Sequence, residues 1–168
     1  AAAGAAASPK ADAGNIVFSK QPIAPDKPEN LTTSFQAGDS IYAVVYPKKT
    51  FEDMAEGSSS IYLEIKCFLD GKYNNAGSYS IKFKKPALSR KTLVLDLAPE
   101  AKKMTAYLDK DLVYKDVFEK LGKRAGPMKF TKFLSTLKPG KHTIKLVAYR
   151  YGDMAVGTFT LQGDDYKT

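Results

Sequence analysis

The sequence predicts a mainly β protein, an antiparallel β-sandwich of about eight or nine strands with one short amphipathic helix. Short segments rich in branched and aromatic residues alternate apolar and polar positions. Turn signals recur between them at intervals of about 8 to 12 residues, which is typical of sandwiches. The hydrophobic period changes from strand-like to helix-like in one place, after Asp109.

The expected strands include one long, strongly marked segment near the end of the chain. It follows a turn at Pro139-Gly140. Proline fixes the φ angle that the turn needs, and glycine allows the next position a backbone conformation that other residues adopt with strain. Asp70-Gly71 is a hairpin signal, although residues 72–77 lengthen that connection, and Gly152-Asp153 joins the last two strands. The expected strands cover residues 15–19, 31–35, 41–46, 61–69, 79–84, 92–97, 141–151 and 155–161.

One helix is expected between two strands in the second half of the chain. Asp109 or Asp111 can cap it, and Gly126-Pro127 ends it. Its apolar stripe consists of Val113, Val117, Phe118 and Leu121. We expect this helix to cover an end or an edge of the sheets, as natural proteins often protect sheet edges. Residues 50–60 form a solvated loop or a single helical turn, in preference to a metal loop built on their three acids.

The chain divides into three parts by composition. Residues 1–14 are rich in alanine and glycine and predict a flexible tether or a remnant of cloning. Residues 15–163 form one sandwich domain, and 164–168 form a polar tail. Such a tether is typical of lipoproteins and secreted proteins of the bacterial envelope, so we expect an exported protein. No apolar run approaches the roughly 20 residues of a membrane-spanning helix.

The segment from Leu137 to Ile144, followed by Val147-Ala148-Tyr149, resembles a turn and penultimate strand of known modules. It is similar to those of immunoglobulin-like and related jelly-roll β-sandwich modules in secreted or surface bacterial proteins. The resemblance covers about a fifth of the chain and implies a sandwich fold. The expected helix near Val113, and the lack of paired cysteines and a core tryptophan, depart from the immunoglobulin pattern and leave a jelly roll open. No functional residue is carried over from it.

The net charge of +8 is concentrated in two segments. Residues 82–91 contain five basic residues and no acid, and residues 110–141 contain nine basic residues against three acids. If they adjoin in the fold, they form a basic patch that attracts phosphate, anionic lipid or acidic glycan. A solvated lysine-rich surface is the favoured interpretation, because arginine is the better phosphate ligand.

The residue types that carry catalysis are sparse. His142 has no local nucleophile and Cys67 lies in phase with a hydrophobic strand, so we expect both to be structural. Nucleotide-binding loops and zinc-ligand sets do not occur in this sequence. A calcium site or an acid–base pair built from Asp96, Asp109 and Asp111 stays open, although helix capping explains the last two. We expect no enzyme and no cofactor.

The sequence contains ten tyrosines, and their positions within the expected strands bear on function. In several strands the tyrosines lie out of phase with the aliphatic residues, so they are either buried under other elements or form an exposed face. The candidate binding residues are Tyr42, Tyr62, Tyr149, Arg150, Tyr151, Lys82, Lys84 and Lys85.

These observations favour a non-enzymatic, exported binding or structural module that contacts protein or glycan through a tyrosine-bearing sheet face. The alternative is a binder of nucleic acid or another anionic polymer through segments 82–91 and 110–141. Lysines interleaved with aromatics, as in Phe83-Lys84 and residues 130–133, support that alternative. A calcium-dependent or glycan-acting enzyme is the third hypothesis.

Overall fold

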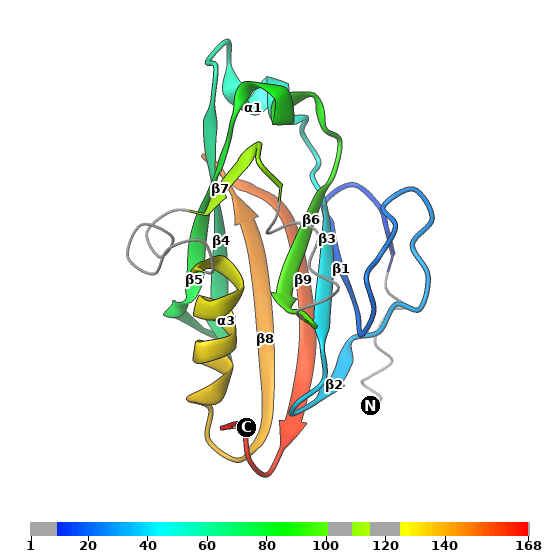
Figure 1. Cartoon of the computed structure of the whole chain (residues 1–168), viewed down its shortest axis with the longest axis vertical. Helices are drawn as coiled ribbons and strands as arrows, with labels where there is room; N and C mark the ends of the chain where they lie inside the picture. Colours follow the sequence, from blue (N-terminus) through cyan, green and yellow to red (C-terminus); the bar gives the residue numbers. More distant parts are fainter. Residues whose placement is uncertain (1–9, 101–108, 115–124, 168) are drawn as a thin grey trace.

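The computed structural model describes residues 10–100, 109–114 and 125–167, and within them the chain is mainly β, as expected (Figure 1). The helical elements are α1 (Phe51–Ala55), α3 (Ala125–Ser135) and the 3-10 turn η1 (Lys85–Ser89). The strands are β1 (Asn15–Ser19), β2 (Ser34–Gln36), β3 (Ile41–Tyr46), β4 (Ile61–Leu69), β5 (Lys72–Phe83), β6 (Leu93–Ala98), β7 (Leu112–Tyr114), β8 (Gly140–Tyr149) and β9 (Asp153–Gly163).

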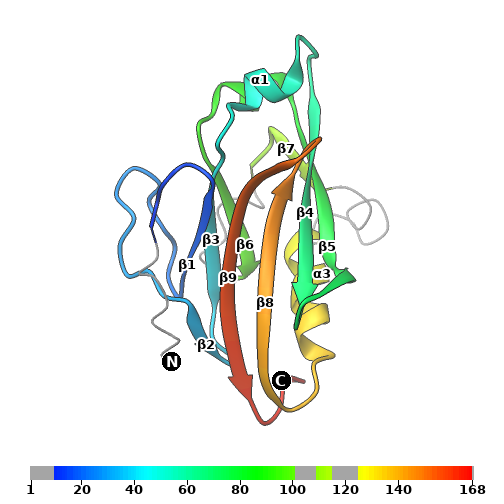
Figure 2. The ribbon, with the colours of Figure 1, turned by 180° about the vertical axis from the view of Figure 1, so that it is seen from behind.

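The strands join into one curved sheet in the order β6-β3-β1-β9-β8-β4-β5-β7, and β2 also pairs with β9. The pairs β1–β9 and β2–β9 are parallel and the other pairs are antiparallel. The sheet curls into a half-barrel, and α3 lies on its concave side in contact with both β5 and β6 (Figures 1 and 2). The expected pair of antiparallel sheets is therefore replaced by one mixed sheet, because periodicity within a strand says nothing about the direction of its neighbour.

The long strand expected after Pro139-Gly140 is present as β8 and lies in the middle of the sheet. It pairs with β9 on one side and β4 on the other, and both pairings are antiparallel. The expected final hairpin is also present, with Tyr149 opposite Asp153 and a loop of Arg150, Tyr151 and Gly152.

The β4–β5 hairpin is tighter than expected. Leu69 pairs with Lys72, so the loop consists of Asp70 (φ 50°) and Gly71 (φ 87°). Positive φ at both positions gives a turn whose twist matches that of the flanking strands. Residues 72–77 therefore belong to β5 and do not lengthen the connection.

The structure corrects both ends of the expected helix. The segment after Asp111 forms β7, which pairs with the end of β5, and Val113 lies opposite Lys82. Gly126-Pro127 lies in the first turn of α3, where a proline is tolerated because its missing N–H has no intrahelical acceptor. Val117, Phe118 and Leu121 fall outside the described residues. The single turn expected within residues 50–60 is α1, capped by the Thr50 side chain.

The core fills the concave side of the sheet. Phe130 and Phe133 of α3 are buried against it, together with the inward residues of the strands. Helix and sheet approach closely at Gly77, where an added Cβ would lie 2.7 Å from the Cys67 Sγ and 3.0 Å from the Phe133 ring. The helix thus closes the half-barrel from inside and leaves the convex face of β4, β5 and β8 uncovered by it.

A second, smaller cluster lies on the convex side of β1 and β3. Val17 and Val44 pair across the two strands and are buried beneath Ile23. Ile23 and Leu31 belong to the proline-rich loop between β1 and β2, which covers this part of the sheet. The Tyr46 hydroxyl donates to the Pro25 carbonyl at 2.8 Å and ties the loop down. Part of the convex face is therefore core.

Candidate functional site

The convex face of β4 begins the candidate site. Strand pleating sends Ile61, Leu63 and Ile65 inward, where they are fully buried. The residues between them point outward: Tyr62, Glu64, Lys66 and Phe68. The aromatic and basic side chains on this side of β4, β5 and β8 and in the β8–β9 loop make the outer aromatic face, which consists of Tyr62, Lys66, Phe68, Tyr73, Lys82, Lys145, Tyr149, Arg150 and Tyr151.

Cations lie on aromatic rings along this face. The Lys66 Nζ is 3.6 Å from the ring centroid of Tyr149, and the Lys145 Nζ is 4.8 Å from that of Phe68. The Lys82 Nζ lies 5.9 Å from the Tyr62 centroid. At these distances the ring quadrupole attracts the ammonium. All cation–ring contacts described in the structure belong to the outer aromatic face.

Strand register explains these contacts. Tyr62 is directly opposite Lys82 across β4 and β5, and Phe68 is directly opposite Lys145 across β4 and β8. Lys66 is opposite Val147 and so is the diagonal neighbour of Tyr149, within reach of a long side chain. The same register places Phe68 opposite Tyr73, and their rings meet edge to face with centroids 5.8 Å apart.

Arg150 anchors one end of the face. Its Nε donates to the Met54 carbonyl and its Nη1 to the Tyr62 carbonyl, each at 3.2 Å. Its guanidinium carbon lies 4.8 Å from the centroid of the Tyr151 ring. Arg150 therefore joins the β8–β9 loop to α1 and β4, and supports a tyrosine that is 81% exposed.

The structure brings five of the eight sequence-predicted binding residues together on the outer aromatic face, and the other three, Tyr42, Lys84 and Lys85, lie outside it. Tyr42 is buried, and its hydroxyl accepts a hydrogen bond at 2.9 Å from the backbone N–H of Glu100, so the chain after β6 covers it. Tyr42 therefore takes no part in the outer aromatic face. Lys84 and Lys85 are exposed just beyond Lys82, where β5 passes into η1.

Four residues of this face are not among the sequence-predicted binding residues: Lys66, Phe68, Tyr73 and Lys145. Lys66 and Phe68 lie out of phase with the buried residues of their strand, and this signal alone could have indicated their outward direction. Their partners could not be found in this way, because the contacts depend on the register between strands that are distant in sequence.

The predicted structural histidine, His142, forms an ion pair at the other end of the face. Its Nδ1 lies 2.7 Å from an Asp70 carboxylate oxygen and its Nε2 lies 2.7 Å from the Lys138 carbonyl oxygen. Burial alone would lower the pKa of His142, but these two acceptors and the charge of Asp70 raise it above the usual value. The hydrogen bond with His142, and a second from the Thr143 backbone N–H, lower the pKa of Asp70.

Cys67 is buried on the inner side of β4, and burial raises the pKa of its thiol to about 12. A thiol that stays protonated at neutral pH is a poor nucleophile. Its packing against Gly77 and α3 gives it a structural role.

Two of the three carboxylates considered for catalysis lie together. Asp109 and Asp111 both contact Arg90, whereas Asp96 is buried within β6. Two hydrogen bonds from Arg90 to the Asp109 carboxylate are the leading cause of that group's lowered pKa. This arrangement is an ion-pair cluster that links the start of β6 to the start of β7.

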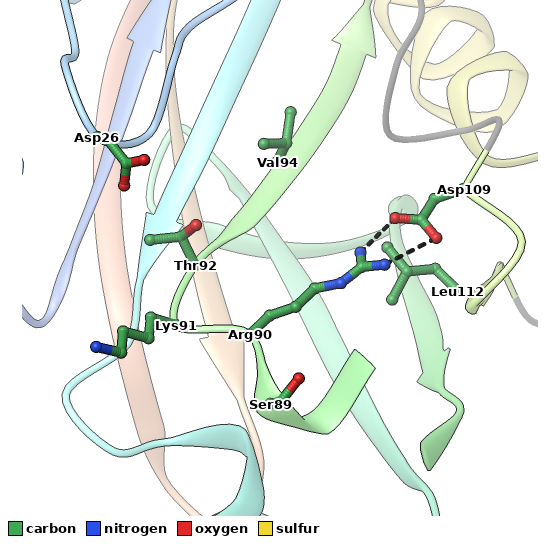
Figure 3. Close-up of a pocket in the computed structure, with 8 residues that line it drawn as sticks. All are labelled: Asp26, Ser89, Arg90, Lys91, Thr92, Val94, Asp109 and Leu112. Carbon is green, nitrogen blue, oxygen red and sulfur yellow. Dashed lines mark hydrogen bonds and ion pairs between the residues drawn. The ribbon is translucent and has the colours of Figure 1, made fainter. Parts of the chain in front are cut away.

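The Arg90 cluster lines an open cleft of about 530 Å³, with Asp26, Lys91 and Thr92 at its other side (Figure 3). The guanidinium points toward Asp109 across the cleft. Because two carboxylates already hold Arg90, the cleft presents little positive charge to an anionic ligand.

The two basic segments adjoin in the part of the chain that the structure describes. Lys82 pairs with Val113, and the Lys84 N–H donates to the Asp111 carbonyl. Much of the second segment, residues 115–124, lies outside the described ranges. Among the described residues, the basic side chains that contact aromatic rings are Lys82, from the first segment, and three from neither segment: Lys66, Lys145 and Arg150.

Within the described ranges, no three His, Cys, Asp or Glu side chains gather into a possible metal site. The helices of the same ranges are too short or too polar to span a membrane. The sequence matches no protein-family model, and no curated protein is recognisably similar to it.

Proposed function

We propose that this chain is a non-enzymatic, exported binding module that contacts a glycan through the outer aromatic face. The observation that carries the proposal is the position of the exposed large hydrophobic side chains. In the described ranges these are Tyr62, Tyr73 and Tyr151, and all three belong to this face. Exposed aromatics gathered in one place favour a contact surface.

Tyrosine suits such a contact, because its ring offers apolar area and its hydroxyl offers hydrogen bonds. Sugar rings carry C–H faces and hydroxyl groups, which are complementary to both. From Tyr62 to Phe68 the face follows six residues of β4, or about 20 Å at 3.3 Å per residue. This length suits a linear chain of several sugars.

Rigid strands hold the candidate residues in position. Tyr62, Lys66 and Phe68 are spaced along one strand, and both neighbours of β4 are hydrogen-bonded to it. Sites built on strands are held more precisely than sites on loops, so little ordering is required when a ligand binds.

The proposal is tested by biolayer interferometry on immobilised neutral and acidic polysaccharides. We expect the unmodified protein to bind at least one of them, and Tyr62→Ala/Tyr151→Ala to weaken that binding at least tenfold. Gln162→Ala, an exposed change on β9, serves as the control and leaves binding within twofold. Absence of glycan binding, equal binding by the double variant, or release of reducing sugar would each contradict the proposal.

The second candidate function is binding of nucleic acid through the basic segments. This function is favoured because residues 82–84 lie beside residues 111–113, so the two basic segments meet there. It requires affinity for single-stranded DNA that falls steeply with salt and with Lys84→Ala/Lys85→Ala. Protein that passes a DNA column at 50 mM salt without retention would remove this candidate.

The proposed export rests on the composition of residues 1–14. Fractionation of the native host tests it independently of binding: recovery of the protein in the cytoplasmic fraction alone would contradict export and leave the binding proposal standing.

A further inference from the structure

We infer that the ligand of the outer aromatic face is an acidic polysaccharide, held by the ammonium groups of Lys66, Lys82 and Lys145. This inference rests on the proposed function and names the chemistry of its ligand. It goes beyond tyrosine contacts, which would suit a neutral glycan equally well.

The three ammonium groups form a row along the strands. Lys82 lies at the level of Tyr62, Lys66 is four residues further along β4, and Lys145 is opposite Phe68, two residues beyond. At 3.3 Å per residue the steps between these levels are about 13 Å and about 7 Å. The row therefore runs along the whole length of the aromatic face.

Each ammonium lies within about 6 Å of a ring centroid and keeps its capacity for an anion. Among the described residues, no carboxylate lies within 4.0 Å of Lys66, Lys82 or Lys145, whereas Lys20 and Lys27 have acidic partners. An ammonium has three donors, and a ring face occupies only one side of it. The donors that remain can meet carboxylate or sulfate groups of a ligand.

Two acids on the same side of the sheet limit which polyanion fits. Glu64 lies between Tyr62 and Lys66 on β4, and it is opposite Tyr149, which itself pairs with Asp153. A polymer with a charge on every unit would place some of its charges against these carboxylates. A glycan whose acidic sugars alternate with neutral ones can place its charges at the lysines and its neutral units near Glu64.

The ring contacts distinguish this ligand from single-stranded nucleic acid. Nucleic-acid surfaces of this kind stack bases on open aromatic faces. Here the Tyr149 and Phe68 rings each have a lysine of the protein over them, with the Lys66 Nζ only 3.6 Å from the Tyr149 centroid. A base would have to displace these ammonium groups, whereas an acidic sugar binds to them as they stand.

The test measures equilibrium binding of three probes at 50 and 300 mM salt: hyaluronan, which is acidic at every second sugar, neutral dextran, and a single-stranded oligothymidylate. We expect hyaluronan to bind at least tenfold tighter than the other two, with affinity falling at high salt. Lys66→Gln/Lys145→Gln should weaken hyaluronan binding at least tenfold, and Lys66→Arg/Lys145→Arg should recover most of it.

The matched control is Lys48→Gln/Lys49→Gln, which removes the same charge from exposed positions outside the face. It should stay within twofold of the unmodified protein, and an unchanged thermal midpoint shows that each variant folds. Equal binding of dextran overturns the inference and leaves the glycan proposal standing. Equal or tighter binding of oligothymidylate overturns it in favour of nucleic acid. Failure of every glycan to bind overturns both proposals.

Discussion

Two parts of the convex face of the same sheet are used in opposite ways. Over β1 and β3, the proline-rich loop covers Val17 and Val44 with Ile23, and the surface has become a second core. Over β4, β5 and β8, the corresponding positions carry Tyr62, Lys66 and other aromatic or cationic residues that stay accessible. The covered positions are aliphatic and the accessible ones are aromatic or cationic, so in the described ranges a loop covers the part of the convex face whose outward residues are aliphatic.

The largest expected difference in stability between the two parts is found by introducing an aspartate into each of them. Val44→Asp places a carboxylate at a fully buried position, and we expect a loss of about 4 kcal/mol in the free energy of unfolding. Tyr62→Asp introduces the same charge at a residue that is 43% exposed, so the loss should stay below about 1 kcal/mol. Urea unfolding measures both, and similar losses would contradict the distinction between covered and open parts.

A smaller effect on stability is expected at Arg150, which joins the open part of the convex face to α1 through hydrogen bonds. Arg150→Ala removes hydrogen bonds to the Met54 and Tyr62 carbonyls, and we expect a loss of about 1 to 2 kcal/mol. Arg150→Lys keeps the charge but lacks the planar guanidinium, so it should recover less than half of the stability that Arg150→Ala loses. The urea midpoint at constant slope measures this, and full recovery by lysine would show that charge alone matters there.

The smallest effect concerns the ion pair of His142 with Asp70, which fastens the β4–β5 turn to β8 at the far end of the open face. Because the pKa of folded His142 is raised, its contribution is fully present below the unfolded value of 6.5 and is lost as pH rises through the folded value. Because the pKa of Asp70 is lowered, its contribution is present above 3.8 and is lost as pH falls through the folded value.

We therefore expect His142→Gln to destabilise the protein most between about pH 4 and pH 6.5, by less than about 1 kcal/mol because solvent screens the pair. Above pH 7 the difference from the unmodified protein should shrink. Unfolding curves in urea across this pH range measure the effect. A difference that grows steadily with pH would show that the pair does not act through protonated histidine.

Several elements could be predicted from local sequence because their causes are local. The turn at Asp70-Gly71 and the long strand after Gly140 depend on residues that adopt the required dihedrals or alternate with period two. The expected end of the helix at Gly126-Pro127 was wrong because this pair can end one helix or begin another, and local sequence does not distinguish these cases. Phe130 and Phe133 of α3 meet β5 and β6, which are distant in sequence.

The candidate site was predicted in part for the same reason. An out-of-phase position indicated that Tyr42 and Tyr62 both point away from the concave core. It could not indicate that the chain near Glu100 covers Tyr42, while nothing in the described ranges buries Tyr62 to the same degree. Covering is a property of segments that meet only after folding.

By itself, the sequence determined that the chain is mainly β, which strand residues face the core, and where several chain reversals lie, though not the length of each connection. These follow from backbone dihedrals and a two-residue period, which act between neighbours. Only the tertiary structure decided the parallel pairing of β1 and β2 with β9, the position of α3 inside the half-barrel, and the register that sets Lys66 over Tyr149. Those features depend on contacts between distant segments, whose free energies are gained only when the whole sheet has assembled.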